Sequence, residues 1–151
     1  MHPFAAAATM VAIVLNGAMA SAQSTVPPLA IRHDDPSVKW GPCPALFPGA
    51  CEIAVLQGDP GKPNADVLLK VGPGYLLPRH RHSSAERMIL LEGRLRLKYD
   101  RSDAKILTPS TYAYGPAGLP HEAVCEASSR CVLFIAFEGP VDAELVPPGK
   151  P

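Results

Sequence analysis

Short apolar segments separated by turn residues follow one another along most of the chain. Segment 95–99 alternates leucine or tyrosine with arginine and lysine, which predicts a strand with one solvent-exposed face. Glycine, proline, asparagine and aspartate fill the intervals, and the spacing of about ten residues is typical of a sandwich or a barrel. The segments are 52–56, 67–71, 87–91, 95–99, 106–107, 112–114, 121–125 and 132–137. We therefore predict an all-β fold.

Two neighbouring segments carry more specific patterns. Residues 88–91 read Met-Ile-Leu-Leu and are apolar on both faces, which predicts a strand buried between two layers. Only Glu92 and Gly93, with Arg94, separate this strand from segment 95–99. Because a short glycine turn commonly joins antiparallel strands, we predict that the two segments form a hairpin.

Composition narrows the class of protein. The 151 residues include 18 prolines, which argue against long helices and therefore against a helical bundle or a coiled coil. Lysine and arginine number 14, as do aspartate and glutamate, so the formal net charge is zero. This balance offers no electrostatic basis for binding nucleic acid or an anionic membrane. The length fits a single domain.

The N-terminus has the pattern of an export signal. The apolar run 4–15 is shorter than the stretch of about 20 residues that spans a bilayer. Residues 18–20 and 20–22 both fit the A-x-A cleavage pattern. We predict that residues 1–22 are a signal peptide cleaved after Ala20 or Ala22, that the protein is periplasmic or secreted, and that it has no membrane span. An uncleaved anchor is the alternative, because only the α-amino group and His2 could supply positive charge at the start.

Export bears on the oxidation state of the four cysteines. Their number is even, and in an oxidising compartment this favours two disulfides. Cys43 and Cys51 bracket a loop rich in proline and glycine, and Cys125 and Cys131 flank a polar turn that a hairpin would close. Local pairing is the simplest of the three connectivities. Four buried thiols are the alternative, and no CxxC spacing of a zinc ribbon is present.

The remaining chain divides at composition changes. Residues 23–50 form a predicted irregular, proline-rich arm in which Trp40 and Phe47 pack on the outside of the core. Residues 51–140 hold the β domain, and residues 141–151 are predicted to be a C-terminal tail.

Three histidines and one glutamate suggest a metal site. His80 and His82 are two residues apart, so on a strand they project to the same face while Arg81 points away. Glu86 follows after a short turn and can reach the same point. His121 follows a turn of proline and glycine at the entry to another strand and is the obvious fourth donor. Imidazole and carboxylate donors in this number suit a divalent ion.

These residues stand in two recognisable motifs. Residues 74–93 match every specified position of the first cupin motif, G(X)5HXH(X)3–4E(X)6G. Residues 116–121 match the central part of the second, G(X)5PXGXXH(X)3N. Ser110 replaces its opening glycine and Cys125 replaces its closing asparagine, and neither position carries a metal ligand in the family. Over about residues 50–140 the chain therefore resembles the cupin superfamily, with a single cupin domain.

The resemblance implies a fold and a metal. The fold is a double-stranded β-helix, a jelly-roll barrel, with the site inside its mouth. One divalent ion, of Fe, Mn, Ni, Cu or Zn, would be held by His80, His82, Glu86 and His121. The candidates for the cavity wall are Tyr75, Met88, Tyr112, Tyr114, Phe134 and Phe137. A homodimer through a sheet face is also consistent with the family.

The functional alternatives stay open at this point. The resemblance implies a metal-dependent enzyme for a small oxygenated substrate, by dioxygenase, decarboxylase, lyase or isomerase chemistry, with Glu86 as a proton relay. Among Arg79, Arg81 and Arg87, one could contact an acidic substrate. The competing class is a non-catalytic sensor that binds a metal or a small-molecule ligand. A structural protein with a vestigial site is the third alternative.

Overall fold

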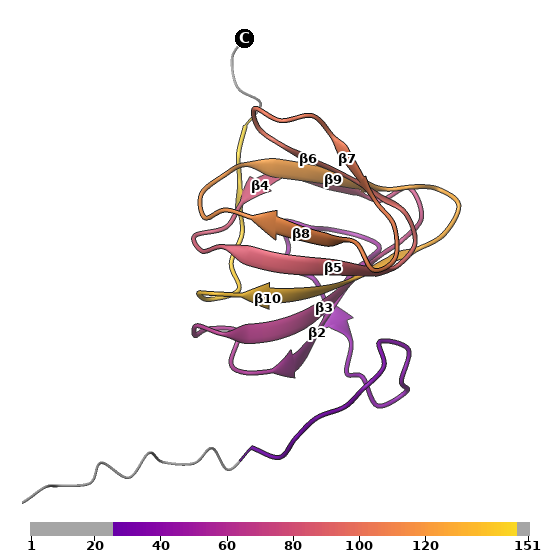
Figure 1. The fold of residues 1–151 in the computed structure, drawn as a ribbon, viewed down its shortest axis with the longest axis vertical. Coiled ribbons are helices and arrows are strands. Elements are labelled where there is room, and N and C mark those ends of the chain that lie inside the picture. The colour runs from indigo at the N-terminus through magenta and orange to yellow at the C-terminus, as the bar shows by residue number, and fades with distance from the viewer. Residues whose placement is uncertain (1–25, 148–151) are drawn as a thin grey trace, which may run out of the picture. The chain divides into compact units, whose positions relative to one another are not determined.

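The computed structural model describes residues 26–147, which form strands and no helix (Figure 1). No helix in this part of the chain could therefore cross a membrane. The predicted signal peptide, residues 1–22, lies outside the described residues. The chain divides into two compact units between Ala30 and Ile31, and the strands belong to the second. The prediction of an all-β fold is confirmed.

Eleven strands form two antiparallel sheets in this unit. They are β1 (Gly41–Pro42), β2 (Cys51–Gln57), β3 (Ala65–Val71), β4 (Leu76–Arg81), β5 (Glu86–Glu92), β6 (Leu95–Tyr99), β7 (Lys105–Leu107), β8 (Tyr112–Gly115), β9 (His121–Cys125), β10 (Cys131–Phe137) and β11 (Glu144–Leu145). One sheet has the order β1-β2-β3-β10-β5-β8 and the other the order β11-β4-β9-β6-β7. Side chains from both sheets pack in one core, as in a jelly roll.

The predicted hairpin between segments 87–91 and 95–99 is wrong. Strand β5 pairs with β10 and β8, whereas β6 pairs with β9 and β7, so the turn at Gly93 carries the chain from one sheet to the other. Gly93 has a φ of 90°, a left-handed conformation that glycine adopts without steric cost. Leu90 and Leu95, on either side of this turn, are both fully buried in the shared core. A short glycine turn is compatible with a hairpin within one sheet and with a crossing between two sheets. The crossing is favoured because it buries the leucines of β5 and of β6 in the core between the sheets.

The alternation predicted for segment 95–99 is confirmed in β6. Leu95 and Leu97 are buried, whereas Arg96 and Lys98 are exposed. The large side chains with almost no exposure come mainly from the inward positions of β3, β5, β6 and β10. Burying them removes apolar surface from water at about 25 cal/mol per Å², which is the main force holding the two sheets together.

A second, smaller apolar cluster covers the outer face of the six-stranded sheet. Leu68 lies at its centre, and Trp40 and Phe134 pack against it. The Nζ of Lys70 lies 4.1 Å from the centroid of the Trp40 ring, a cation–π contact that joins this part of the arm to β3. Phe134 was predicted to line the cavity and does not, because it alternates along β10 with the inward-facing Leu133 and Ile135.

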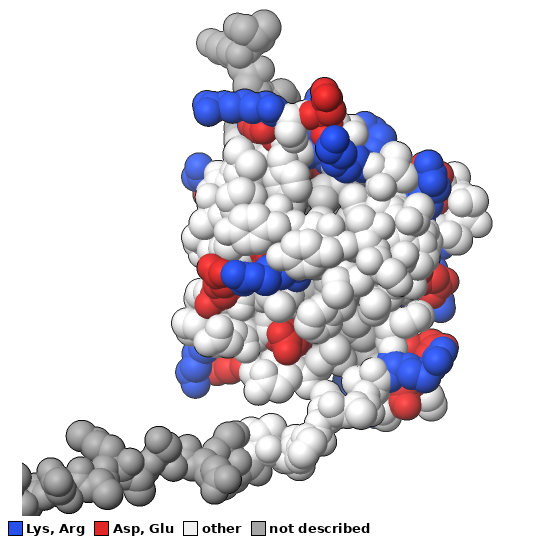
Figure 2. Space-filling model, viewed as in Figure 1, with Lys and Arg blue, Asp and Glu red and all other residues white. Residues whose placement is uncertain are grey.

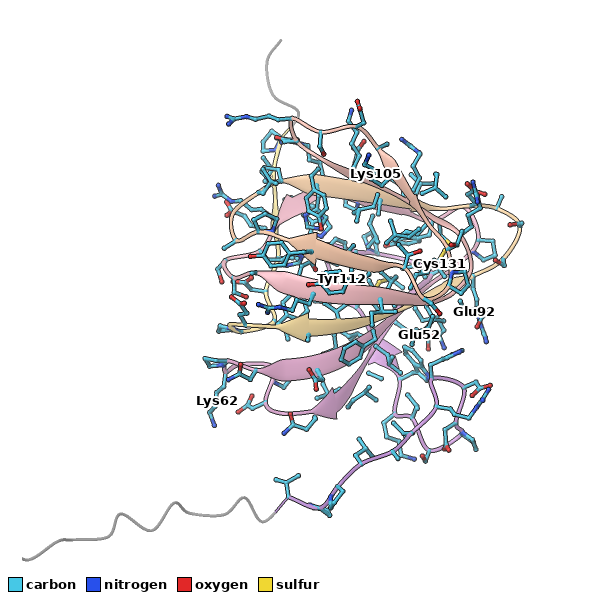
Figure 3. The ribbon with its side chains drawn as sticks, in the orientation of Figure 1. Glu52, Lys62, Glu92, Lys105, Tyr112 and Cys131 are labelled. Carbon is cyan, nitrogen blue, oxygen red and sulfur yellow. A yellow bond between two sulfur atoms is a disulfide. The ribbon has the colours of Figure 1, made fainter. Side chains whose placement is uncertain are left out.

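Both disulfides join the cysteines nearest in sequence, Cys43 to Cys51 and Cys125 to Cys131, which confirms local pairing. The hairpin predicted around the second pair is wrong, because β9 and β10 belong to different sheets. This disulfide therefore ties one sheet to the other (Figure 3). Cys51 and Cys131 both lie opposite Val71 in the strand register, so the two disulfides meet the six-stranded sheet at the same end.

Removal of the disulfide between the sheets is expected to lower stability. The loop it closes is short, so the variant Cys125→Ala/Cys131→Ala should lose about 2 kcal/mol in the free energy of unfolding. Urea unfolding of this variant and of Cys43→Ala/Cys51→Ala measures the two contributions separately. Alkylation of four thiols in the native protein without a reductant would contradict both pairings.

The C-terminal segment adds an edge to the five-stranded sheet. The sequence predicts a domain that ends at residue 140, and β11 extends the ordered structure beyond it. Leu145 lies opposite His80 in the register of β11 and β4, and the Val146 amide donates to the Arg79 carbonyl. The Arg79 guanidinium donates to the Pro147 carbonyl at 2.6 Å. Hydrogen bonds of the backbone and of the Arg79 side chain make these contacts, and they leave no apolar pattern in the sequence.

Candidate metal centre

Three histidines meet in the interior between the two sheets. His80 and His121 lie directly opposite each other in β4 and β9, and His82 follows β4 on the same side as His80. One ring nitrogen from each lies within 4.8 Å of the others, and all three side chains are buried. Arg81, which lies between His80 and His82 in the sequence, is exposed. The convergence predicted from the spacing of two residues is therefore present.

Each imidazole is oriented by a hydrogen bond from Nδ1 to a backbone carbonyl. The acceptors are the carbonyls of Pro78 for His80 (2.6 Å), Asp142 for His82 and Leu119 for His121 (3.4 Å). A carbonyl oxygen can only accept, so the proton resides on Nδ1 and the lone pair on Nε2. Metal-binding histidines in proteins are held in this way by their second nitrogen. The three rings are thus set to donate through Nε2.

Glu86 reaches the histidines from the opposite sheet. It is the first residue of β5 and is only 2% exposed. Its Oε1 lies 3.3 Å from the Nε2 of His121, and its Oε2 lies 3.5 Å from the Nε2 of His82. Oε1 has no hydrogen-bond partner among the described residues. A buried carboxylate oxygen without a donor is costly, and a cation among these four side chains would satisfy it, so the donor set fits a divalent metal.

Two residues that the sequence analysis missed shape the carboxylate's position. Tyr99 lies opposite His121 in the register of β6 and β9, with ring centroids 5.0 Å apart, and its buried hydroxyl lies beside the Glu86 carboxyl without a hydrogen bond of normal geometry. Gly115 lies opposite Glu86 in β8. A Cβ at position 115 would come within 2.7 Å of both Glu86 Oε1 and the Tyr99 hydroxyl. Glycine at this position therefore leaves the room that the two polar groups occupy.

Burial shifts the pKa of every group in the cluster. It lowers the pKa of His80 to about 4 and that of His121 to about 3, with neighbouring imidazoles adding to the effect. Burial also lowers the pKa of His82. It raises the pKa of Glu86 to about 8, and the Tyr99 hydroxyl only partly offsets this. Without a metal, the site at neutral pH therefore holds three neutral imidazoles and a protonated carboxyl.

The site opens into a cavity of about 330 Å³ inside the barrel. Of the predicted wall residues, Met88 and Phe137 line it. Tyr112 does not, because it occupies an outward position of β8 and is 57% exposed (Figure 3). Tyr114 lies on the same face of β8 and is 48% exposed, so it does not line the cavity. Tyr75 does not line it either, because its hydroxyl turns away to donate to the Pro48 carbonyl.

The proline-rich loop closed by the first disulfide supplies part of the cavity wall. Phe47, predicted on the outside of the core, is 9% exposed and lines the cavity with Cys43, Pro44 and Leu46. Its ring meets the His80 ring edge-on at 4.9 Å between centroids. No periodic pattern marks this loop in the sequence, and the disulfide that bends it back toward the barrel is the one signal that could have placed Phe47.

The pKa shifts predict how the stability of the metal-free protein depends on pH. The folded-state pKa of His80, His82 and His121 lies below the ordinary 6.5, so the unfolded chain binds protons more readily, and each histidine costs stability as the pH falls below 6.5. The folded-state pKa of Glu86 lies above its ordinary 4.5, so the folded chain holds this proton more tightly than the unfolded chain does. The resulting contribution to stability is fully present below pH 4.5 and is lost as the pH rises through 8. Each group contributes about 1.4 kcal/mol per unit of pH within its window.

Stability of the metal-free protein, as set by these groups, should therefore be greatest near pH 6.5. Thermal unfolding in the presence of a chelator from pH 4.5 to 8.5 measures this. In the variant His121→Gln, one proton fewer is taken up on unfolding below pH 6.5, so stability should fall less steeply with decreasing pH. An unchanged melting temperature between pH 5 and 6.5 would contradict the assignment of three buried neutral imidazoles.

A jelly-roll barrel with three inward histidines on facing positions defines a cupin. The family model of the ChrR cupin-like domain matches residues 30–142, and the chain belongs to this family. A search of the curated proteins finds no match to the chain.

Several solved structures share the fold. The DMSP lyase DddQ from Ruegeria pomeroyi is 20% identical, with a TM-score of 0.62, and the match covers 75% of this chain and 64% of that one. A cupin-2 domain from Rhodospirillum rubrum is 20% identical, with a TM-score of 0.63 and coverage of 80% and 83%. A structure of Rhodobacter sphaeroides SigE in complex with the anti-sigma ChrR matches at 23% identity and a TM-score of 0.54, with coverage of 70% and 50%. At these identities the likeness is one of fold, and the chain spans less than two thirds of the DMSP lyases that it matches.

Proposed function

We propose that His80, His82, Glu86 and His121 bind one divalent metal ion. The observation that carries this proposal is the arrangement of three imidazoles, each held by its Nδ1, around an unpartnered carboxylate oxygen. Imidazole and carboxylate donors suit Fe, Mn, Ni, Cu or Zn. Four protein donors leave one or two positions of a five- or six-coordinate ion for a substrate or water. When bound, the ion would supply Lewis-acid or redox chemistry at the floor of the cavity.

We further propose that the protein is a metal-dependent enzyme for a small oxygenated organic molecule. The cavity next to the metal residues supports this, because its walls are mainly apolar and its volume of about 330 Å³ suits a compact substrate. Glu86 is placed to hold or pass a proton, with the Tyr99 hydroxyl beside it. Fold neighbours that are named as enzymes include DMSP lyases and an oxalate oxidase. The resemblance to the cupin superfamily gives dioxygenase, decarboxylase, lyase and isomerase chemistry as the range to be tested.

A ligand-binding or metal-sensing module is the second candidate. It is favoured by the family match to the ChrR cupin-like domain and by the fold shared with the SigE–ChrR complex. Such a module would bind a metal, and its stability would rise accordingly, without turnover.

Water relaxation tests whether the bound ion keeps an open position, which the enzyme proposal requires. The chain is reconstituted with Mn²⁺, and the relaxation rate of solvent protons is measured before and after addition of a small chelating ligand. An enzyme site is expected to show an exchangeable water on the ion that the ligand displaces. A bound ion without exchangeable water would contradict the enzyme proposal and favour the module.

We propose that the protein is exported and that residues 1–22 are its signal. The two disulfides support an oxidising compartment. N-terminal sequencing of the protein recovered from a periplasmic extract should begin at Ser21 or Gln23. A chain that still begins at Met1 would contradict cleavage.

A further inference from the structure

The walls of the cavity are hydrocarbon beyond the metal residues. Strands of both sheets line it with inward side chains that include Leu69, Leu97, Leu133, Ile135 and Phe137. Of the described lining residues, the ionisable ones are the three histidines and Glu86 at the site, together with Asp142. No lysine or arginine of the described chain lines the cavity. The polar chemistry is thus confined to one end.

The basic residues nearest the motif are paired elsewhere. Arg79 forms a bidentate ion pair with Asp100, Arg81 pairs with Glu144 at 2.7 Å, and Arg87 pairs with Glu138. None of the three arginines lines the cavity. On the face of the molecule that Figure 2 shows, lysine and arginine side chains lie on the surface, and several of them are beside acidic side chains. The sequence hypothesis that one of these arginines contacts an acidic substrate therefore has no support in the cavity.

This lining discriminates among ligands. A second carboxylate, a phosphate or a row of sugar hydroxyls would be buried against leucine and phenylalanine without a partner, which costs more than the contacts return. A hydrocarbon body would instead gain from burial at every methylene. The cavity's volume of about 330 Å³ limits that body to a compact size, since ligand pockets range from about 300 to 1,000 Å³.

The charge of the head group follows from the donor set. Three neutral imidazoles and one carboxylate reduce the charge of a divalent ion by one. A singly negative head that offers two oxygens would neutralise the remaining charge and fill the open positions. A doubly negative head would leave an uncompensated charge in an apolar cavity, which is unfavourable.

We propose that the cavity selects molecules with a single monoanionic oxygen-chelating head and a compact hydrocarbon body, of the type of a β-dicarbonyl enolate or an alkyl hydroxamate. This inference rests on the proposed metal site and names the substrate class for it. Dicarboxylates, uronates and phosphorylated molecules are excluded from the class, because no described residue that lines the cavity offers them a basic partner.

Alkyl hydroxamates of increasing length test the proposal. The full chain is loaded with Zn²⁺, its metal content is determined by elemental analysis, and the affinities of acetohydroxamate, butanohydroxamate and hexanohydroxamate are measured by titration calorimetry. Affinity is expected to rise about threefold for each added methylene, roughly 100-fold across the series. The six-carbon hydroxamate with a terminal carboxylate should bind no more tightly than acetohydroxamate.

A rim substitution supplies a second measurement. Val141 is half-buried and lines the cavity, so Val141→Arg introduces a basic partner without burying it in the core. This variant should bind the terminal carboxylate at least tenfold more tightly than the parent chain does. Leu145→Arg is the matched control, because Leu145 is exposed on the same segment and does not line the cavity.

Two outcomes separate this inference from the proposal beneath it. In the first outcome, the parent chain holds one zinc ion but binds all the alkyl hydroxamates equally well, or binds the hydroxamate with a terminal carboxylate tightly. Either result would overturn the inference and leave the metal site intact. A chain that retains no zinc would overturn the metal site and the inference together.

Discussion

Replacing His121 with alanine is expected to reduce the bound divalent metal from about one ion per chain to background. The Nε2 of His121 lies 3.3 Å from Glu86 Oε1, and its ring is flanked by the other two histidines, so its removal takes one of three imidazole donors from the site. Changes to the residues that merely orient a ligand already cost about 10- to 100-fold in affinity, and loss of the ligand itself should cost at least that much. Elemental analysis and calorimetric titration with Zn²⁺ measure the effect.

His80→Ala is expected to behave in the same way, and His33→Ala serves as the control. His33 lies in the arm, outside the group of three histidines, so its removal should leave the metal content unchanged. Circular dichroism checks that each variant retains its strands. Full metal content in both His80→Ala and His121→Ala would contradict the site.

Gly93→Ala is expected to destabilise the fold by about 3 kcal/mol or more. At this position the left-handed φ of 90° is itself unfavourable for alanine. A Cβ would also lie 2.3 Å from the Arg130 carbonyl oxygen and 3.0 Å from Cys131 Sγ, so the backbone would have to move where the chain crosses between sheets. Urea unfolding with the disulfides intact measures the loss.

Gly74 offers a matched comparison within the same motif. Its φ is 72°, and a Cβ there would meet nothing within 4 Å. Gly74→Ala should therefore lose only the conformational part, about 1–2 kcal/mol. Equal losses in Gly74→Ala and Gly93→Ala would show that the contact with Arg130 and Cys131 is not what requires glycine at position 93.

The strands with an apolar signal were predictable, and those without one were not. Segments 95–99 and 121–125 coincide with β6 and β9, because each buries one face against the core. Strand β4 lacks a clear run, since Pro78 interrupts it and its pairing with β9 is irregular between Leu77 and His80. Strands β1 and β11 are two residues long and are joined to their sheets by short stretches of backbone pairing, which no apolar pattern marks in the sequence.

The cavity wall was predictable only in part, because aromatic character does not say which way a side chain points. Phe137 faces inward and Phe134 outward on the same strand, since residues three apart lie on opposite faces. Tyr112 and Tyr114 share a face with each other, and the register of β8 with β5 turns that face outward. Phe47 reaches the cavity through a loop that has no period.

The sequence by itself determined the chemistry of the donors. A spacing of two residues on a strand placed His80 and His82 on one side, because such local geometry depends on the chain alone. The motif spacing identified Glu86 and His121 as further donors, and the packing of the two sheets brings these two side chains together. Only the tertiary structure decided what surrounds them. The hydrogen bond from His82 to the Asp142 carbonyl and the hydrocarbon walls, in which no described lining residue is basic, arise from segments far apart in sequence. The packing of the whole barrel sets the register of these segments.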